Sequence, residues 1–398
     1  MSEPVAVGWR GGLRAVVLAA AACGGSADPD GAAPDAAAGA PAESPASGAE
    51  DAGGWEKLPA PPLSGRTGAV VASLGTSIVV TGGWNYLCPP DADCVLPDEP
   101  PHVDGAAYHL DSGQWTSIAD APIGLLWVAA AAVGADLYVL SQCNLGAPCA
   151  AGLAFLRYRS ADDEWDVLPG PDENDPALGG YGLVAVDDGV VAYSQSDEFQ
   201  GGPDFRFSAT QGQWVALPND PLPPMYDRFV VGHAGRLLLF GSPIDGGDRT
   251  KLVASHDPES QTWQELTASG TMGFQVWRAG ALFYLNPHFR GAGGGVYDPE
   301  LNRWSPLPNP PHHDMAGIIG EDEATYAYAA GWVLDTRSGG WLSIEPRPDA
   351  EDVYDVVVAT APEQGLVVFG GQTWTSGEGQ LVNDTWLWRP PAPSGSTR

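Results

Sequence analysis

The chain has 398 residues, with 18 Lys plus Arg against 50 Asp plus Glu, and a net charge of −32 at pH 7. This charge repels phosphate backbones and anionic membrane surfaces, so it argues against nucleic-acid binding. Hydrophobic residues make up 44% of the chain, and 52 glycines, 37 prolines and 15 tryptophans favour many short strands over packed helices.

The N-terminal segment, residues 1–23, has the features of an export signal. Arg10 and Arg14 precede the apolar run Ala15–Ala22, which is too short to span a bilayer but has the length of a signal-peptide core. The run ends on Cys23 and resembles a bacterial lipobox, although Ala20 stands where that motif usually has leucine. We therefore expect lipidation at Cys23, with a plain secretory signal cleaved among the alanines as the alternative.

Residues 24–54 contain no aromatic residue and no aliphatic side chain larger than alanine. Such a segment cannot bury enough surface to offset its ordering entropy, so we expect a disordered acidic linker. Together with the signal, it predicts a bacterial extracytoplasmic protein that is anchored in the cell envelope or secreted. Contact with the membrane is expected only through the lipid anchor.

Four further cysteines form two pairs with the same spacing, Cys88 with Cys94 and Cys143 with Cys149. Each pair lies in a loop rich in Gly, Pro or Asp, and local disulfides are the natural interpretation outside the cytoplasm. The alternative is a four-thiolate metal site, although structural zinc sites usually have closer spacing.

Tryptophan marks a repeat along the rest of the chain. Seven times a Trp opens a short segment with an apolar residue near its third position, and in six of the seven a proline follows; these residues are Trp55, Trp115, Trp165, Trp214, Trp263, Trp304 and Trp341. The spacing of about 40–60 residues is typical of propeller blades with four strands each.

Paired apolar runs recur between the tryptophans, as in "GAVVASLGTSIVVTGG" (Gly68–Gly83) and "VVVATAPEQGLVVFGG" (Val356–Gly371). Each predicts a hairpin of two buried strands with a tight turn. A third run and a polar turn then lead to each Trp, as in "YDPELNRW" (Tyr297–Trp304).

These features resemble kelch repeats over about residues 55–390. The double glycines after Val79–Thr81 and Val367–Phe369, the aromatic–turn–Trp element and "NDTWLW" (Asn383–Trp388) carry the resemblance, whereas the middle repeats lack the double glycine. The resemblance implies an all-β fold, a seven-bladed β-propeller of four-stranded antiparallel sheets over residues 55–391, of the architecture of the central propeller in galactose oxidase-like proteins. We expect residues 392–398 to be a C-terminal tail.

The segment at Trp55 has no hairpin before it, and the last repeat has no Trp-Pro segment of its own. We therefore expect the N-terminal segment to supply the outermost strand of the last blade. This arrangement would close the ring and leave that blade without an open edge.

In a propeller, the loops that enter first strands and those that leave second strands share one face, where kelch proteins typically bind partners. The residues expected to contact a ligand there are Arg66, Trp84, Asn85, Trp127, Gln142, Tyr181, Gln195, Tyr226, Arg228, His288, His313, Tyr354, Gln372 and Trp374. Aromatic rings with amide and guanidinium donors suit sugars or peptides. Alternatively, some of them, Trp127 and Tyr181 above all, are core residues at strand ends.

No complete catalytic or cofactor set is evident. Adjacent histidines in "PHHD" (Pro311–Asp314) would point to opposite faces of a strand, so we expect no metal there and no cofactor. A copper site of the galactose oxidase type needs a cysteine without a cysteine partner, but all four cysteines after Cys23 have one nearby. A sialidase needs three arginines, but the expected binding face offers only Arg66 and Arg228. The motifs G-x-S-x-G and H-E-x-x-H are missing.

We expect a monomeric, non-catalytic binding module for a carbohydrate or a protein partner. The alternative is an extracellular carbohydrate-active enzyme that uses carboxylates in the central funnel as acid and base. A third reading is a structural propeller whose ligand is another subunit of an envelope assembly.

Overall fold

The computed structural model describes residues 53–89, 92, 94, 99–126, 128–142, 153–171, 180–198, 202–245, 250–271, 273, 276–285, 294–307, 326–329, 332–336, 339–350, 353–361, 365–375 and 377–390. The expected signal, Cys23 and the linker up to residue 52 lie outside this part, as does the C-terminal tail. Within the described residues the chain is all-β, and none of them forms a helix that could cross a membrane.

The strands of the described residues form eight antiparallel sheets, most of them four-stranded. The first along the chain contains β2 (Val70–Leu74), β3 (Ser77–Thr81), β4 (Gly105–His109) and β5 (Gln114–Ile118). The second contains β6 (Ala129–Val133), β7 (Asp136–Gln142), β8 (Leu153–Arg159) and β9 (Glu164–Leu168). The third contains β10 (Tyr181–Val186), β11 (Gly189–Ser194), β12 (Phe205–Ser208) and β13 (Gln213–Ala216).

The next two sheets repeat this order. The fourth contains β14 (Met225–His233), β15 (Arg236–Pro243), β16 (Leu252–Asp257) and β17 (Thr262–Glu265). The fifth contains β18 (Val276–Ala279), β19 (Leu282–Leu285), β20 (Gly295–Asp298) and β21 (Arg303–Ser305). The sixth has three strands among the described residues, β22 (Tyr326–Ala329), β23 (Trp332–Asp335) and β24 (Gly340–Ser343).

The last large sheet joins the two ends of the described chain. Its order is β26 (Val357–Ala361), β27 (Gly365–Phe369), β30 (Thr385–Arg389) and β1 (Gly54–Lys57). Strand β1 pairs with β30 with Trp55 opposite Trp388, which is the partner that the sequence predicts for the N-terminal segment.

A small eighth sheet was not expected from the sequence. It contains β25 (Val353–Tyr354), β28 (Gln372–Thr375) and β29 (Glu378–Leu381). The hairpin that the sequence predicts up to Gly371 is formed by β26 and β27. Before it, the chain turns at Asp355, which has a φ of 54°, and β25 pairs with β28 instead. The backbone therefore enters the large sheet only at β26, two residues after this turn.

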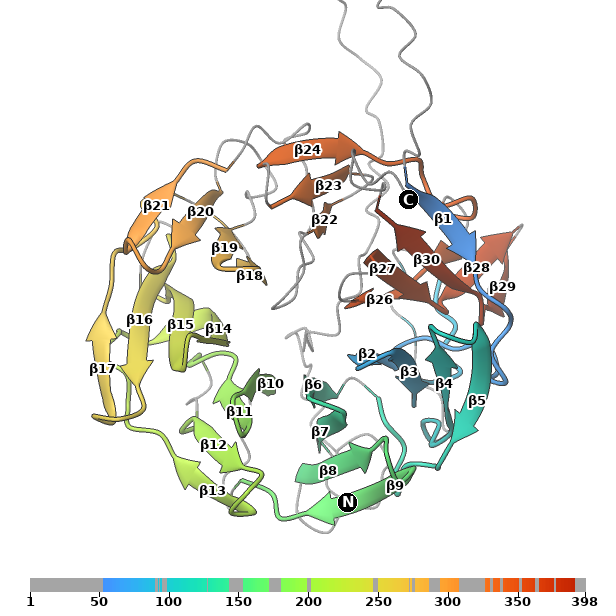
Figure 1. Cartoon of the computed structure of the whole chain (residues 1–398), viewed down its shortest axis with the longest axis horizontal. Coiled ribbons are helices and arrows are strands. Elements are labelled where there is room, and N and C mark those ends of the chain that lie inside the picture. The colour runs from blue at the N-terminus through green and yellow to red at the C-terminus, as the bar shows by residue number, and fades with distance from the viewer. Residues whose placement is uncertain are drawn as a thin grey trace, which may run out of the picture.

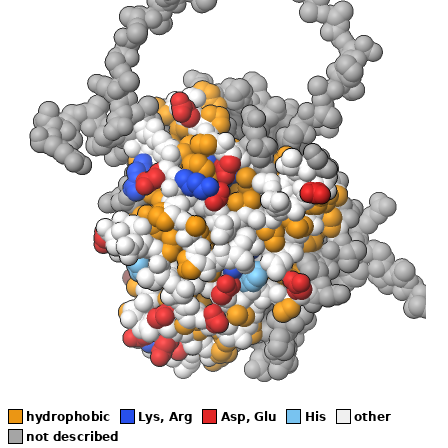
Figure 2. All heavy atoms as spheres, turned by 90° about the vertical axis from the view of Figure 1, so that its right-hand side faces the viewer, with side chains coloured by type: hydrophobic (Ala, Val, Ile, Leu, Met, Phe, Trp, Pro, Cys, Tyr) orange, Lys and Arg blue, Asp and Glu red, His pale blue; other side chains and the backbone are white. Residues whose placement is uncertain are grey.

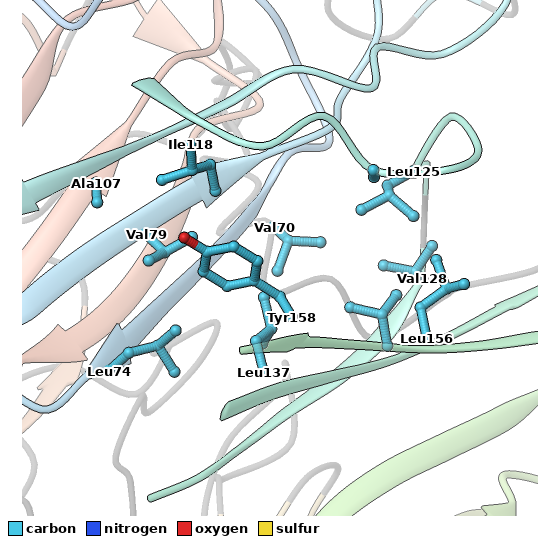
Figure 3. Close-up of a cluster of buried hydrophobic side chains, with 12 residues drawn as sticks. Val70, Leu74, Val79, Ala107, Ile118, Leu125, Val128, Leu137, Leu156 and Tyr158 are labelled. Atoms are coloured by element: carbon cyan, nitrogen blue, oxygen red, sulfur yellow. The ribbon is translucent and has the colours of Figure 1, made fainter. Parts of the chain in front are cut away.

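The large sheets lie around a common centre, and the first strand of each lies nearest to it (Figure 1). Clusters of buried side chains join each sheet to the next; Figure 3 shows the one between the first and second sheets, which includes Val70, Leu137 and Leu156. Another cluster places Ile78 and Tyr108 of the first sheet against Val367 and Leu387 of the last. This arrangement is compatible with a β-propeller.

The Trp segments also repeat in the backbone. The residue two positions before each of the seven tryptophans has a positive φ, between 46° and 69°: Gly53, Gly113, Asp163, Gly212, Gln261, Asn302 and Gly339. Such turns favour Gly, Asn and Asp, which explains the small and polar residues that precede each Trp.

On the side that carries β5 and β29, acidic side chains lie between hydrophobic ones, and the few basic groups lie beside acids (Figure 2).

Candidate functional site

Candidate binding residues gather where β3 ends and β4 begins. We call Trp84, Asn85, Tyr86, Glu99 and His102 the Trp84 cluster. Trp84 forms a two-way backbone bridge with Thr67, and its indole N–H donates to the Glu99 carbonyl at 2.7 Å. Its ring stacks on that of Tyr86 with centroids 6.1 Å apart. Trp84 itself is buried, so it supports the surface residues beside it.

Asn85 is the exposed centre of a polar network in this cluster. Its amide nitrogen donates to Glu99 Oε2 at 3.0 Å, and its Oδ1 lies 2.9 Å from His102 Nε2. Because an amide oxygen can only accept, His102 Nε2 carries the hydrogen. Burial and the nearby Arg66 lower the pKa of His102, while Asp104 and Glu99 oppose them, so the imidazole is neutral near pH 7. The network thus presents amide, carboxylate and imidazole groups together.

Arg66 does not reach the surface. Its guanidinium is 0% exposed and pairs with both oxygens of Asp104, at 2.6 and 3.0 Å. The remaining contacts are to the Gly82 carbonyl, the Ser64 carbonyl and Ser64 Oγ, so all five N–H groups are used. The ion pair holds the pKa of Asp104 below its usual range. Arg66 therefore ties the strand ends together and has no donor left for a ligand.

Arg228 is occupied in a similar way in another part of the fold. It is buried, and it donates to the Ser194 carbonyl at 2.7 Å, to both oxygens of Asp204 and to Asp220. Burial raises the pKa of Asp204, against the opposing effect of Arg228. These carboxylates converge on an arginine rather than on an open cleft, which is not the arrangement expected of a catalytic pair in the central funnel.

Gln372 fastens the cysteine loop to the last part of the chain. Its side-chain oxygen accepts from the Cys88 N–H at 2.9 Å, and its amide nitrogen donates to the Cys88 carbonyl at 2.8 Å. The same side chain contacts Asp355 and Trp374. Cys88 and Cys94 form a disulfide, as their spacing predicts, so both cysteines are joined to each other and, through Gln372, to the last part of the chain.

The remaining predicted residues are dispersed. Tyr181 is buried among Phe205 and other apolar residues, so it belongs to the core alternative. The half-buried ones are Gln195, Tyr226, Tyr354 and Trp374. Gln142 lies at the end of β7, and its side chain is outside the described part, as are Trp127, Cys143, Cys149, His288, His313 and the rest of the "PHHD" motif. Thus the expectation of a ligand contact is weakened for five buried residues: Arg66, Trp84, Tyr181, Arg228 and Gln372.

Sequence reasoning missed Tyr86, Glu99, His102 and Asp104. One signal was available, because Asp104 directly precedes β4 as Asp384 directly precedes β30. The backbone carbonyls of these two aspartates accept from the N–H groups of Gly82 and Gly370, each the first glycine of a Gly-Gly pair. Among the described residues no group of three or more His, Cys, Asp or Glu is arranged to hold a metal ion.

No protein-family model matches this chain, and no curated protein sequence matches it.

Proposed function

We propose that the chain is a closed seven-bladed propeller of the kelch type, in which β1 completes the last blade. The proposal is supported by the seven Trp segments with their shared left-handed residue and by the pairing of β1 with β30. The two Gly-Gly pairs add to it. Gly83 donates to the carbonyl of Leu125, which precedes β6, and Gly371 donates to that of Arg66, which precedes β2. The last and first sheets therefore meet as the first and second do.

The protein is proposed to act outside the cytoplasm, where the Cys88–Cys94 disulfide is stable. The lipid anchor at Cys23 remains part of this proposal. The proposed function of the protein is to bind a carbohydrate or a protein partner without catalysis. The observation that carries this function is the exposed Asn85–Glu99–His102 network, beside Tyr86 and next to a loop that a disulfide and Gln372 hold in place.

The chemistry of this cluster suits a neutral, hydroxyl-bearing ligand or a polar peptide segment. Amide, carboxylate and neutral imidazole groups offer both donors and acceptors, and their hydrogen bonds to one another hold them in place, which reduces the entropy lost on binding. Since both predicted arginines are buried in carboxylate pairs, recognition here does not depend on an exposed cation.

Glycan and peptide arrays with the full chain test this function. A ligand of the Trp84 cluster should lose at least about tenfold in affinity in Asn85→Ala and Tyr86→Ala. Gln213→Ala, which removes an exposed amide on β13, is the matched control and should bind normally. Unchanged binding in both cluster variants would remove this surface from consideration. Hydrolysis of an arrayed glycan would favour the enzyme instead.

A further inference from the structure

A cavity of about 370 Å³ lies at the other end of the sheets from the Trp84 cluster. Its walls include the tight turns between β6 and β7, between β10 and β11, and between β14 and β15. The Trp84 cluster instead follows the far end of a second strand. The volume is in the range of small-molecule sites, so the cavity can hold a ligand of about the size of a monosaccharide.

The lining of this cavity is basic in a strongly acidic protein. Arg206, Arg236 and Arg278 contribute to it together with His233 and His256, whereas Asp187 is the one carboxylate among the described lining residues. The whole chain has 18 Lys plus Arg and 50 Asp plus Glu, so a cavity lined by more basic than acidic residues is unusual for this composition.

Two of the arginines, Arg206 and Arg236, have guanidinium N–H groups that are not used in hydrogen bonds to the described residues. Arg206 uses one nitrogen, which donates to Asp188 at 2.8 Å, and its side chain is 30% exposed. Arg236 is 55% exposed and lies 3.9 Å from Asp257, beyond hydrogen-bond distance. A guanidinium has five N–H groups in a planar fork that matches the two oxygens of a carboxylate or phosphate. Within the described residues, most of these groups on Arg206 and Arg236 have no protein acceptor.

His256 provides an independent sign of a ligand. The residue is 1% exposed and lines the cavity, and its Nε2 is buried with no hydrogen-bond partner among the described residues. A buried polar atom without a partner is unfavourable and calls for an explanation such as a bound group. Burial, together with Arg206, lowers the pKa of His256, so the ring is neutral near pH 7 and can donate to an oxyanion or accept from a hydroxyl.

We propose that this cavity binds a small organic oxyanion, through Arg206 and Arg236, with His256 contacting the same ligand. The shared chemistry is a carboxylate or phosphate group on a body of about monosaccharide size. A polyanion is disfavoured because the net charge of −32 repels it at long range. The site is distinct from the Trp84 cluster and does not depend on the function proposed for it.

Calorimetric titration of the full chain with inorganic phosphate, glucuronate and neutral glucose tests the proposal. We expect binding of one or both anions but not of glucose, and whichever anion binds more tightly identifies the oxyanion. Arg206→Gln and Arg236→Gln should each weaken that binding at least about tenfold. Arg303→Gln, which removes an exposed arginine on β21, should leave it unchanged.

Two readouts keep the test decisive. Arg236 is largely exposed, so Arg236→Gln reports even if Arg206→Gln disturbs folding. In the unaltered chain, the ring ¹⁵N signals of His256, assigned with His256→Phe, should shift on addition of the anion. The absence of anion binding at 10 mM, equal binding in all variants, or anion binding without a shift of the His256 signals would overturn the proposal. Array binding at the Trp84 cluster is unaffected by any of these results.

Discussion

Trp55 donates its indole N–H to the backbone carbonyl of Glu345 at 2.9 Å, across 290 residues of sequence. The same relationship recurs at five further tryptophans of the repeat: each donates to the residue four positions after the preceding Trp. The five other described pairs, at 2.7–2.9 Å, are Trp115 with Pro59, Trp165 with Ala119, Trp214 with Pro169, Trp263 with Pro218 and Trp304 with Thr267. Trp55 thus relates to the Trp341 segment as these five tryptophans relate to the Trp before each of them.

This shared hydrogen bond predicts that the N-terminal Trp stabilises the fold as much as an internal one. Trp55→Phe and Trp214→Phe each remove one hydrogen bond and part of a large ring. Each should lower the free energy of unfolding by about 1–2 kcal/mol, measured by guanidinium denaturation. If Trp55→Phe had no effect while Trp214→Phe did, β1 would not be an integral strand.

The Gly-Gly pair after β27 should tolerate no side chain. Gly371 has a φ of +104°, and a Cβ there would lie 2.4 Å from the Tyr354 carbonyl oxygen. Gly371→Ala should cost more than about 3 kcal/mol of unfolding free energy, by strain and clash together.

Two other glycines separate these two causes. Gly75 has a φ of +59° with open space around it, so Gly75→Ala should cost only about 1 kcal/mol. Gly54 lies in β1 in open space without such a φ, and Gly54→Ala should be close to neutral. Equal costs for Gly371→Ala and Gly75→Ala would show that close backbone approach is not what selects the double glycine.

The sequence predicted the elements that depend on local patterns. The Trp segments and the tight hairpins follow from apolar periodicity and from turn residues next to each Trp, which act over a few positions. The partner of β1 follows instead from counting strands along the chain, because the segment at Trp55 has no hairpin before it and the last repeat has no Trp-Pro segment. The exposure of the candidate residues did not follow, because burial depends on distant partners. Arg66 pairs with Asp104, which is 38 residues away, and the Trp84 indole donates to the carbonyl of Glu99, 15 residues away. The eighth sheet was missed because its first strand, β25, has only two residues and is separated from β26 by Asp355, which has a left-handed backbone conformation.

The Arg66–Asp104 pair predicts a specific acid response. The pKa of Asp104 is lowered in the folded state, chiefly by its hydrogen bonds from Arg66, so its contribution to stability is complete above the unfolded pKa of about 3.9. That contribution is lost as the pH falls through the lower, folded pKa.

Asp104→Asn should therefore destabilise the protein by about 1–3 kcal/mol at pH 7, and the difference from the unaltered chain should shrink as the pH falls below about 4. Urea denaturation at a series of pH values measures this difference. A gap that stayed constant or widened in acid would contradict the assigned ion pair.

The Cys88–Cys94 disulfide closes a short loop, with a sequence separation of 6. Chain-entropy reasoning gives a stabilisation of roughly 2 kcal/mol for so short a loop. The double variant Cys88→Ser/Cys94→Ser should lose about this amount, and faster amide exchange should be concentrated in the loop between β3 and β4. Exchange that accelerated equally in β14–β17 would show that the bridge supports the whole fold rather than this loop.

The central claim is that β1 lies beside the C-terminal strand, and cross-linking tests it most directly. The chain has two lysines, Lys57 and Lys251; Lys251 is buried, whereas Lys57 Nζ lies 2.6 Å from Asp384 Oδ2. A zero-length carbodiimide reaction followed by peptide mass spectrometry should yield a Lys57–Asp384 isopeptide bond, which Asp384→Asn abolishes. Cross-links from Lys57 only to carboxylates outside the last sheet would contradict the account.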